Sequence, residues 1–415
     1  MTILKWDHNL QLRLLGEGMF YFFYWMYFPF LTVYFSRELG NSIAGMLMMV
    51  PPIVSTLANL TGGGLADRMG RRPIMLLGTA IQTAMFAALA LSPSAWLSYF
   101  YFIGVSLGSA LYSPASSAMI ADLVEEKERR QVFATFTTAN NIGAVLGPAL
   151  GAVLFFKYQS ALLWTCTSIL FIYLLAMFFA IHETKPAVRN EKRNVKLTDL
   201  VFRSLWDSVK LIAHDKVFGL YILAGVFSII TIMQLDLYLA VYVINHVPAQ
   251  PLVSWENWHV MLSSSEVFGW LLGLNGLMFV LLILPISGWL KNWSERNIML
   301  LSCVLSGFGT FAIGLNTNIW YLFAMTVVFT LGEIVRSPVT QSFVSHYAPT
   351  HARAQYMGAS NLQFTMGRFL APLAVLISSW VPPMGVFSLL LLFSMISMVL
   401  YINLFKIYEK TKKGT

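Results

Sequence analysis

Twelve runs of apolar residues divide this chain of 415 residues, and each run is long enough to cross a lipid bilayer as a helix. The runs fall near residues 14–35, 43–66, 74–92, 96–120, 132–156, 160–181, 217–245, 269–290, 297–316, 319–345, 355–379 and 384–406. A polar, basic segment separates the first six from the last six. We therefore predict an all-α membrane protein with twelve transmembrane helices in two six-helix bundles, at 1–181 and 217–415, joined by a cytoplasmic linker at 182–216.

The composition excludes a soluble protein, because 57% of the residues are hydrophobic and only 11% are charged, whereas soluble chains carry about a quarter charged residues. The net charge of +8 comes from Lys and Arg that gather between alternate apolar runs. This asymmetry predicts a multi-pass protein of the cytoplasmic membrane with both termini in the cytoplasm, and no nucleic-acid partner. Charge without topological meaning is the alternative. The two cysteines, Cys166 and Cys303, lie far apart in apolar runs and indicate neither a disulfide nor a metal site.

The two halves of the chain share a pattern of prolines. Pro114 and Pro148 recur 224 residues later as Pro338 and Pro372. Chance can produce such matches, but the apolar runs around them correspond as well. Two related halves predict a transport site between the halves, near the middle of the membrane.

A tight basic turn separates the second and third apolar runs. Glycines allow the chain to reverse there, and an aspartate among arginines can hold neighbouring helix ends. Asp122, at the end of the fourth run, is expected within reach of this turn. Such a cluster would close the inner mouth of a transporter and separate when the halves move; ordinary surface charge is the alternative. The candidate gating residues are Gly64, Asp67, Arg68, Gly70, Arg71, Arg72 and Asp122.

Acidic residues inside apolar runs are the strongest functional signal. An ionisable group there is costly unless it is paired or wetted, so it suggests function by default. Glu333 lies on a polar stripe at helical spacing, and Asp236 stands alone among apolar and aromatic residues. We predict proton coupling by Asp236, Glu333 and Glu17. A static ion pair between Glu333 and Arg336 is the alternative for Glu333.

Aromatic residues follow Glu17 at helical spacing. A carboxylate beside aromatic rings suits a cationic or amphipathic ligand; an aromatic girdle at the membrane interface, with Glu17 reaching water, is the alternative. The residues predicted to line a substrate cavity are Tyr21, Tyr24, Trp25, Tyr238, Arg336, Asn361 and Arg368.

The fifth run contains small residues four positions apart, with a proline beside one of them. This pattern allows two helices to approach closely and bends the span. The residues concerned are Gly143, Gly147, Pro148 and Gly151.

These motifs together resemble the major facilitator superfamily. The basic turn is similar to the loop signature between its second and third helices, and the glycine motif to the fifth-helix signature of its proton-coupled antiporters. Segments 9–14, 232–236 and 330–335 resemble the lactococcal-type branch of its drug:proton antiporters. The resemblance implies proton-coupled efflux of amphipathic or cationic drugs by alternating access, with antibiotic resistance as a consequence. It also implies a monomer in membrane lipid that takes small amphipathic substrates and needs no cofactor or metal, the proton being the coupling ion.

The resemblance assigns proton coupling or drug recognition to the carboxylates of Asp67, Asp122, Asp236 and Glu333. The chain departs from the family where Thr137 and Thr138 occupy the region of a fifth-helix aspartate. It also lacks an arginine within 96–118, where many antiporters of the superfamily carry one in the fourth helix.

Three other functions are alternatives to drug efflux. An exporter or flippase of a specific anionic or lipid-like solute would use Arg336 and Arg368 as substrate ligands. A membrane-embedded enzyme is disfavoured, because the sequence has no nucleotide-binding glycine loop, metal-ligand cluster or nucleophile–base pairing. A sensor would bind ligand without moving solute.

The segment 246–268 is predicted to be a long outer loop.

Overall fold

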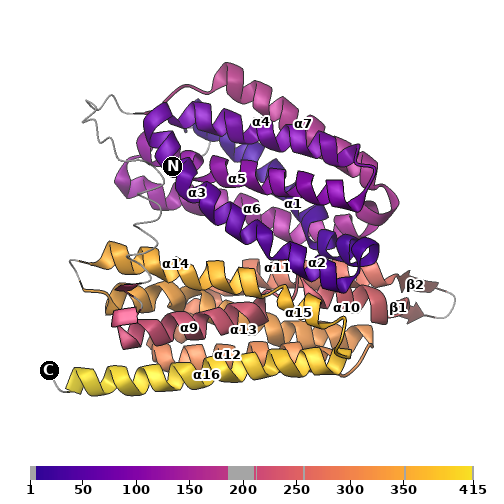
Figure 1. Cartoon of the computed structure of the whole chain (residues 1–415), viewed down its shortest axis with the longest axis vertical. Coiled ribbons are helices and arrows are strands. Elements are labelled where there is room, and N and C mark those ends of the chain that lie inside the picture. Colours follow the sequence, from indigo (N-terminus) through magenta and orange to yellow (C-terminus); the bar gives the residue numbers. More distant parts are fainter. Residues whose placement is uncertain (1–5, 186–209, 212, 256–257, 350–351, 414–415) are drawn as a thin grey trace. The chain divides into compact units, whose positions relative to one another are not determined.

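The computed structural model describes residues 6–185, 210–211, 213–255, 258–349 and 352–413, and helices account for most of them (Figure 1). The helices are α1 (His8–Leu39), α2 (Asn41–Met48), α3 (Val50–Met69), α4 (Arg71–Ala90), α5 (Ala95–Leu123), α6 (Glu126–Lys157), α7 (Gln159–Ala180), α9 (Lys216–Ile232), α10 (Tyr238–His246), α11 (Ser264–Trp289), η2 (Leu290–Asn292), α12 (Glu295–Ile313), α13 (Ile319–Tyr347), α14 (Arg353–Leu370), α15 (Leu373–Ile377) and α16 (Pro383–Lys413).

The helices confirm the predicted all-α membrane fold. Within the described residues, eight helical segments are long and apolar enough to cross a membrane. Three predicted spans are broken: 43–66 becomes α2 and α3, 217–245 becomes α9 and α10, and 355–379 becomes α14 and α15, which starts directly after Pro372. A proline cannot donate the backbone hydrogen bond that would continue the preceding helix. Most of the predicted linker, at 186–209 and 212, lies outside the described residues.

The chain forms two compact units. Unit 1 comprises residues 1–28 and 50–202, and unit 2 comprises residues 29–49 and 203–415. The predicted first bundle included 29–49, but here α2 packs against α15 of unit 2. Gly45 permits this contact, because a Cβ there would collide with the backbone of Leu376. Asn41 also donates a hydrogen bond of 3.0 Å to the Ser378 hydroxyl.

In unit 1, α5 packs against α3 and α4, and α4 also packs against α7 (Figure 1). Apolar side chains from these helices form a shared core that includes Met75, Met119, Tyr173 and Met177. Small residues bring α4 and α5 together, since a Cβ on Gly78 would lie 2.7 Å from the backbone oxygen of Gly108. Burying this core fixes the inward faces of α4, α5 and α7, which carry polar side chains nearer to α1.

In unit 2, α9, α12, α13 and α16 pack around a second core (Figure 1). Its centre is aromatic: Tyr221 stacks on Phe343 with 4.8 Å between ring centroids, and Phe218 packs edge-on against Tyr356 at 4.7 Å. Offset and edge-to-face ring contacts add to the stabilisation that burial provides. The packing holds α13, which carries Glu333, beside α11 and α12.

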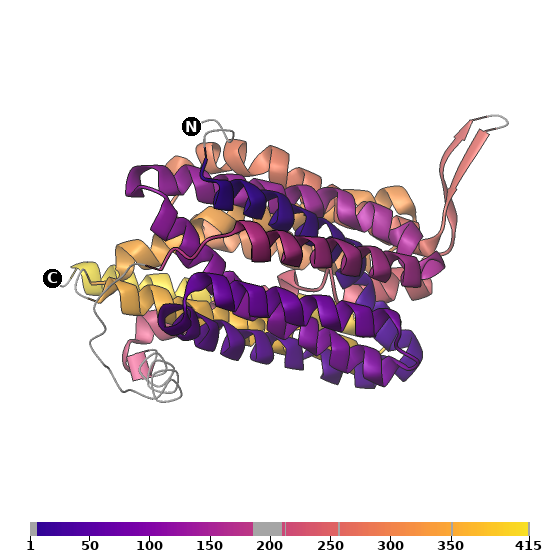
Figure 2. The ribbon, with the colours of Figure 1, turned by 90° about the horizontal axis from the view of Figure 1, so that it is seen from above.

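The segment predicted as an outer loop contains a β-hairpin instead. Strands β1 (Gln250–Trp255) and β2 (Trp258–Leu262) pair antiparallel, with Gln250 opposite Leu262, and the hairpin extends beyond the helix ends of unit 2 (Figure 2). The side chain of Gln250 anchors it by donating to the Thr317 carbonyl at 2.7 Å and accepting from the Ile319 amide at 3.2 Å. Cross-strand pairing satisfies backbone groups that a loop would leave to water.

Candidate functional site

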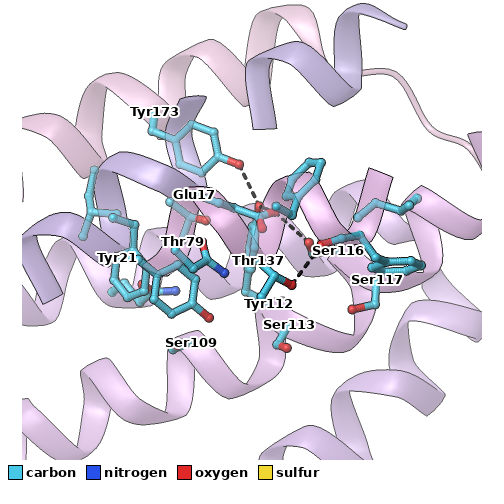
Figure 3. Close-up of a pocket in the computed structure, with 17 residues that line it drawn as sticks. Glu17, Tyr21, Thr79, Ser109, Tyr112, Ser113, Ser116, Ser117, Thr137 and Tyr173 are labelled. Atoms are coloured by element: carbon cyan, nitrogen blue, oxygen red, sulfur yellow. Dashed lines mark hydrogen bonds between the residues drawn. The ribbon is translucent and has the colours of Figure 1, made fainter. Parts of the chain in front are cut away.

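Unit 1 encloses a polar cavity of about 160 Å³ between α1, α4, α5, α6 and α7 (Figure 3). Hydroxyl, amide and carboxylate groups make up much of its wall, although the cavity lies among apolar helices. Its polar lining residues are Glu17, Tyr21, Thr79, Gln82, Ser109, Tyr112, Ser113, Ser116, Ser117, Thr137, Asn140 and Tyr173. A polar cavity in such a setting is where a transporter would hold a hydrophilic ligand or water.

Glu17 lies at the centre of the hydrogen bonds on this wall. Its Oε1 accepts from Arg13 Nη2 at 2.8 Å and Nε at 3.2 Å, from the Tyr112 hydroxyl at 2.7 Å and from the Ser116 hydroxyl at 2.7 Å. Tyr112 also shares a hydrogen bond of 2.7 Å with the hydroxyl of Tyr173. These contacts are charge-assisted, and they fix the carboxylate in one orientation (Figure 3).

Arg13 is the partner that the sequence analysis missed. Its side chain is fully buried, forms an ion pair with Glu17 one helical turn away, and contacts the Ser116 hydroxyl of α5. Its guanidinium also lies over the Phe136 ring, 5.2 Å from the centroid. The fourth run carries no arginine within 96–118, and α1 supplies the buried arginine that contacts Ser116 of α5. The spacing of Arg13 and Glu17, four residues apart, was the available signal.

The ion pair with Arg13 argues against the alternative in which Glu17 belongs to an interface girdle and reaches water. A girdle residue would reach towards water at the membrane surface, but the Glu17 side chain is only 12% exposed and is held by a buried arginine. Tyr21 lines the same cavity. Tyr24 stacks on Phe28 at 4.7 Å, and Trp25 packs edge-on against Tyr24, so these two rings form an aromatic cluster further along α1.

The glycines of the fifth run bring α6 against α1. A Cβ on Gly143 would lie 2.8 Å from the Phe22 backbone, and one on Gly147 would lie 2.7 Å from the Trp25 Cβ. A Cβ on Gly151 would lie closer still to its neighbour, the backbone carbonyl of Met26. Pro148 lies inside α6 beside these contacts. This close approach places Thr137 and Asn140 of α6 on the wall of the cavity that contains Glu17.

Unit 2 brings the other two predicted acids together. Asp236 lies in the turn between α9 and α10, and its Oδ1 is buried without a hydrogen-bond partner. Glu333 of α13 accepts a hydrogen bond of 2.6 Å from Asn275 Nδ2, which also donates to Thr330 at 3.0 Å. The negative charge of Asp236 acts on the Glu333 carboxylate. The role of Asn275 on α11 was not predicted.

The predicted cationic residues of unit 2 have different surroundings. Arg336 is 5% exposed and donates to the side-chain oxygen of Gln363 at 3.2 Å, and no ion pair joins it to Glu333 within the part of the chain that the structure describes. Arg368 is exposed and interacts electrostatically with Asp236. Asn361 is also exposed. Tyr238 is 2% exposed and packs edge-on against Phe387, so it belongs to the core of unit 2 and not to a cavity wall.

The basic turn forms a network around Arg71, at the start of α4. Arg71 pairs with Asp122 at 2.8 Å and with Asp67 at 3.2 Å, which joins the ends of α3, α4 and α5. Gly70 precedes α4 with a φ of 110°, a conformation that favours glycine. Gly64 lies inside α3, one turn before Arg68. Thus the predicted turn joins helix ends directly, with little loop between them.

Glu183 completes this network and was not predicted. Its carboxylate accepts hydrogen bonds from the backbone amides of Arg71 at 3.0 Å and Arg72 at 3.2 Å, at the amino terminus of α4. Burial alone would raise the pKa of Glu183, but hydrogen bonds from the amides of Lys185, Arg71, Arg72 and Thr184 outweigh it and lower the pKa from 4.5. Lys185 binds the Arg68 carbonyl at 2.7 Å.

Comparison with known proteins supports a transport role for this architecture. The family model described as Major Facilitator Superfamily matches residues 14–248 and 247–415. The chain is 36% identical over 418 residues to a "Na(+), Li(+), K(+)/H(+) antiporter" of Planococcus maritimus, with 99% of each chain covered. It is 25% identical over 353 residues to "Multidrug resistance protein MdtH" of Cronobacter sakazakii, covering 83% of this chain and 80% of that protein. A solved structure of a POT family transporter in complex with 5-aminolevulinic acid shares the fold, with a TM-score of 0.76, 17% identity and 99% of each chain covered.

Proposed function

The chain belongs to the major facilitator superfamily and is a membrane transporter, not an enzyme, and from this premise we propose that it exchanges protons for monovalent cations. The resemblance inferred from the motifs is confirmed at the level of the superfamily; the lactococcal-type drug transporter branch stays a prediction. We place the protein in the cytoplasmic membrane as a monomer, with both termini in the cytoplasm, because its basic residues gather on one side.

The acid pair of unit 2, Asp236 and Glu333, is the observation on which this proposal depends. Two carboxylates that interact in an apolar setting repel each other when both are charged, so the pair favours taking up a positive species. Glu333 accepts a hydrogen bond from the neutral side-chain amide of Asn275, and Oδ1 of Asp236 has no hydrogen-bond partner. A proton taken up from one side of the membrane and released to the other would meet this need.

Exchange also requires that each ligand favours one conformation over the other. We propose that proton uptake by Asp236 and Glu333 favours release of the substrate cation outward, and that proton loss to the cytoplasm resets the cycle. The network of Arg71, Asp67 and Asp122 would hold one conformation and break in the other. No cofactor enters this cycle; the proton is the coupling ion.

Monovalent metal cations are the substrate class we favour. The relative from Planococcus maritimus, with 36% identity over almost the full length of both chains, is named as an antiporter of these ions. The oxygen-rich cavity of unit 1 is consistent with this choice, because carboxylate, carbonyl and hydroxyl oxygens are ligands for hard cations.

Efflux of amphipathic cationic drugs is the second candidate, and the aromatic cluster of α1 favours it. Tyr21, Tyr24 and Phe28 follow Glu17 within about three helical turns, and these neighbouring rings suit an organic cation. Relatives named MdtH point the same way at lower identity. An anionic substrate is less well supported, because Arg336 is buried and bonded to Gln363.

Transport by the purified protein in proteoliposomes separates these candidates. We expect an imposed pH gradient to drive accumulation of Na⁺, Li⁺ or K⁺, and a trapped pH dye to report proton movement in the opposite direction. Ethidium in place of the metal ion tests drug efflux. Asp236→Asn and Glu333→Gln should each abolish accumulation driven by the gradient, whereas Glu38→Gln, at an exposed carboxylate near the end of α1, should not. Gradient-driven accumulation in both acid variants would contradict the role of the pair.

A further inference from the structure

We propose that the polar cavity of unit 1 is a binding site for the substrate cation, separate from the acid pair of unit 2. This inference rests on the proposed function, which makes the substrate a monovalent cation. It adds the location of the ion, and beside Glu17 it names two ligands that neither the motifs nor the relatives' names indicate: Gln82 and Asn140.

Gln82 of α4 provides the first reason. Its side chain is 3% exposed and lines the cavity, and its Oε1 has no hydrogen-bond partner. A buried carbonyl oxygen without a partner is costly, so native proteins satisfy such atoms with protein groups, water or ions. The neighbouring glycine on α5, Gly108, leaves little room for Gln82 to turn away, since a Cβ at Gly108 would lie 2.9 Å from Gln82 Cγ. A cation bound in the cavity that Gln82 lines would satisfy this oxygen.

Asn140 of α6 provides the second reason. It also lines the cavity, and its Oδ1 is buried without a partner. The two amides come from different helices, and the close packing of α6 on α1 through Gly143 is what places Asn140 there. Two unpartnered carbonyl oxygens on one cavity wall share the same requirement, which is a positively charged or hydrogen-donating ligand.

Glu17 provides the charge for such a ligand. All of its protein hydrogen bonds within the described residues converge on Oε1, and Glu17 lines the cavity, so Oε2 has no protein hydrogen bond there. Arg13 is buried behind the carboxylate and is not a lining residue. Arg13 offsets the charge of Glu17, so the site should bind its ion weakly, as a transporter must in order to release it.

The chemistry of the lining indicates which ion fits. Among the residues that the structure describes, the cavity presents a single carboxylate with neutral carbonyl and hydroxyl oxygens, and neither histidine nor cysteine lines it. Soft or transition metals prefer nitrogen and sulfur ligands, and divalent hard ions usually need more carboxylates. A cavity of about 160 Å³ holds an alkali ion together with several waters. Sodium, lithium or potassium is therefore the ligand class that matches.

Equilibrium binding of radioactive Na⁺ to the purified full-length protein tests this site without requiring transport. We expect Gln82→Leu and Asn140→Leu each to weaken Na⁺ binding by roughly tenfold, and Glu17→Gln to weaken it at least as much. Gln82→Glu adds a second carboxylate and should tighten binding, a gain that a folding defect cannot produce. Asn59→Leu, at an exposed amide of α3 that bonds its own helix, is the matched control and should bind as wild type.

The acid variants distinguish this inference from the proposed function. If Asp236→Asn and Glu333→Gln lose proton-driven transport but keep Na⁺ binding that depends on Gln82, both proposals hold. If Na⁺ exchange occurs but binding is unchanged in Gln82→Leu and Asn140→Leu, the cavity holds only water and this inference is overturned. If no proton-coupled exchange occurs but Na⁺ binding is still weakened by Gln82→Leu and Asn140→Leu, the cavity site is supported and the exchange function is contradicted.

Discussion

Arg13 and Glu17, one turn apart on α1, form a buried ion pair in which both Nε and Nη2 of the arginine donate to the same carboxylate oxygen, at 3.2 and 2.8 Å. Ser116 and Tyr112 of α5 donate to that oxygen as well. Burying two charges is costly, and only mutual pairing and further hydrogen bonds offset the cost. The pair therefore joins α1 to α5 and orients the carboxylate that faces the cavity.

Removing only one partner of this ion pair should destabilise the protein more than removing both partners. Arg13→Met leaves Glu17 buried without its cation, and we expect a loss of about 3–5 kcal/mol in unfolding free energy. Arg13→Met combined with Glu17→Met removes both charges and should recover most of that loss. Thermal unfolding in detergent measures the three proteins. A double variant no more stable than Arg13→Met would show that the charges are not coupled.

The packing of α6 on α1 should depend on Gly151. Gly151→Ala places a Cβ against the carbonyl of Met26, and since backbone cannot turn aside as a side chain can, we expect a loss of about 1–3 kcal/mol. Gly63→Ala is the matched control, because its Cβ would meet nothing nearer than 3.8 Å. Equal melting temperatures for the two variants would indicate that α1 and α6 are not in close contact.

The start of α4 should require glycine at position 70. Gly70→Ala forces a side chain into a φ of 110° and towards the carboxylate of Glu183. The backbone strain alone is expected to cost about 1–3 kcal/mol. Gly288→Ala, where a Cβ would have open space, should be neutral by comparison. Thermal stability of both variants in detergent provides the measurement, and a neutral Gly70→Ala would contradict the observed turn.

Glu183 should make stability depend on pH in the acidic range. Its pKa is lower in the folded protein than the ordinary value of 4.5, so its contribution is fully present above pH 4.5 and is lost as the pH falls through the folded pKa. Melting temperatures measured downward from pH 6 should fall more steeply for the wild type than for Glu183→Gln. Parallel curves for the two proteins would show that Glu183 does not cap α4.

Hydrophobic patterning predicted the helices well, because a segment of apolar residues that crosses a bilayer must satisfy its backbone hydrogen bonds within itself. It did not predict the breaks near Asp236 and Pro372, since an apolar run looks the same whether its helix is continuous or interrupted. The hairpin at 250–262 was missed for a related reason: its pairing depends on contacts of Gln250 with residues near 317–319, far away in the sequence.

The sequence by itself determined the class of protein and the positions of the helices. It also identified the acidic residues that lie inside apolar segments, where burying a charge is costly. Tertiary structure alone decided which of these residues meet. It placed Glu17 beside Tyr112 and Ser116 of α5, made the charge of Asp236 act on Glu333, and buried Arg336 and Tyr238, which had been expected in a cavity. The reason is physical: periodicity shows which residues share a face of one helix, but the close approach of helices, set by glycines and core side chains, decides which faces meet.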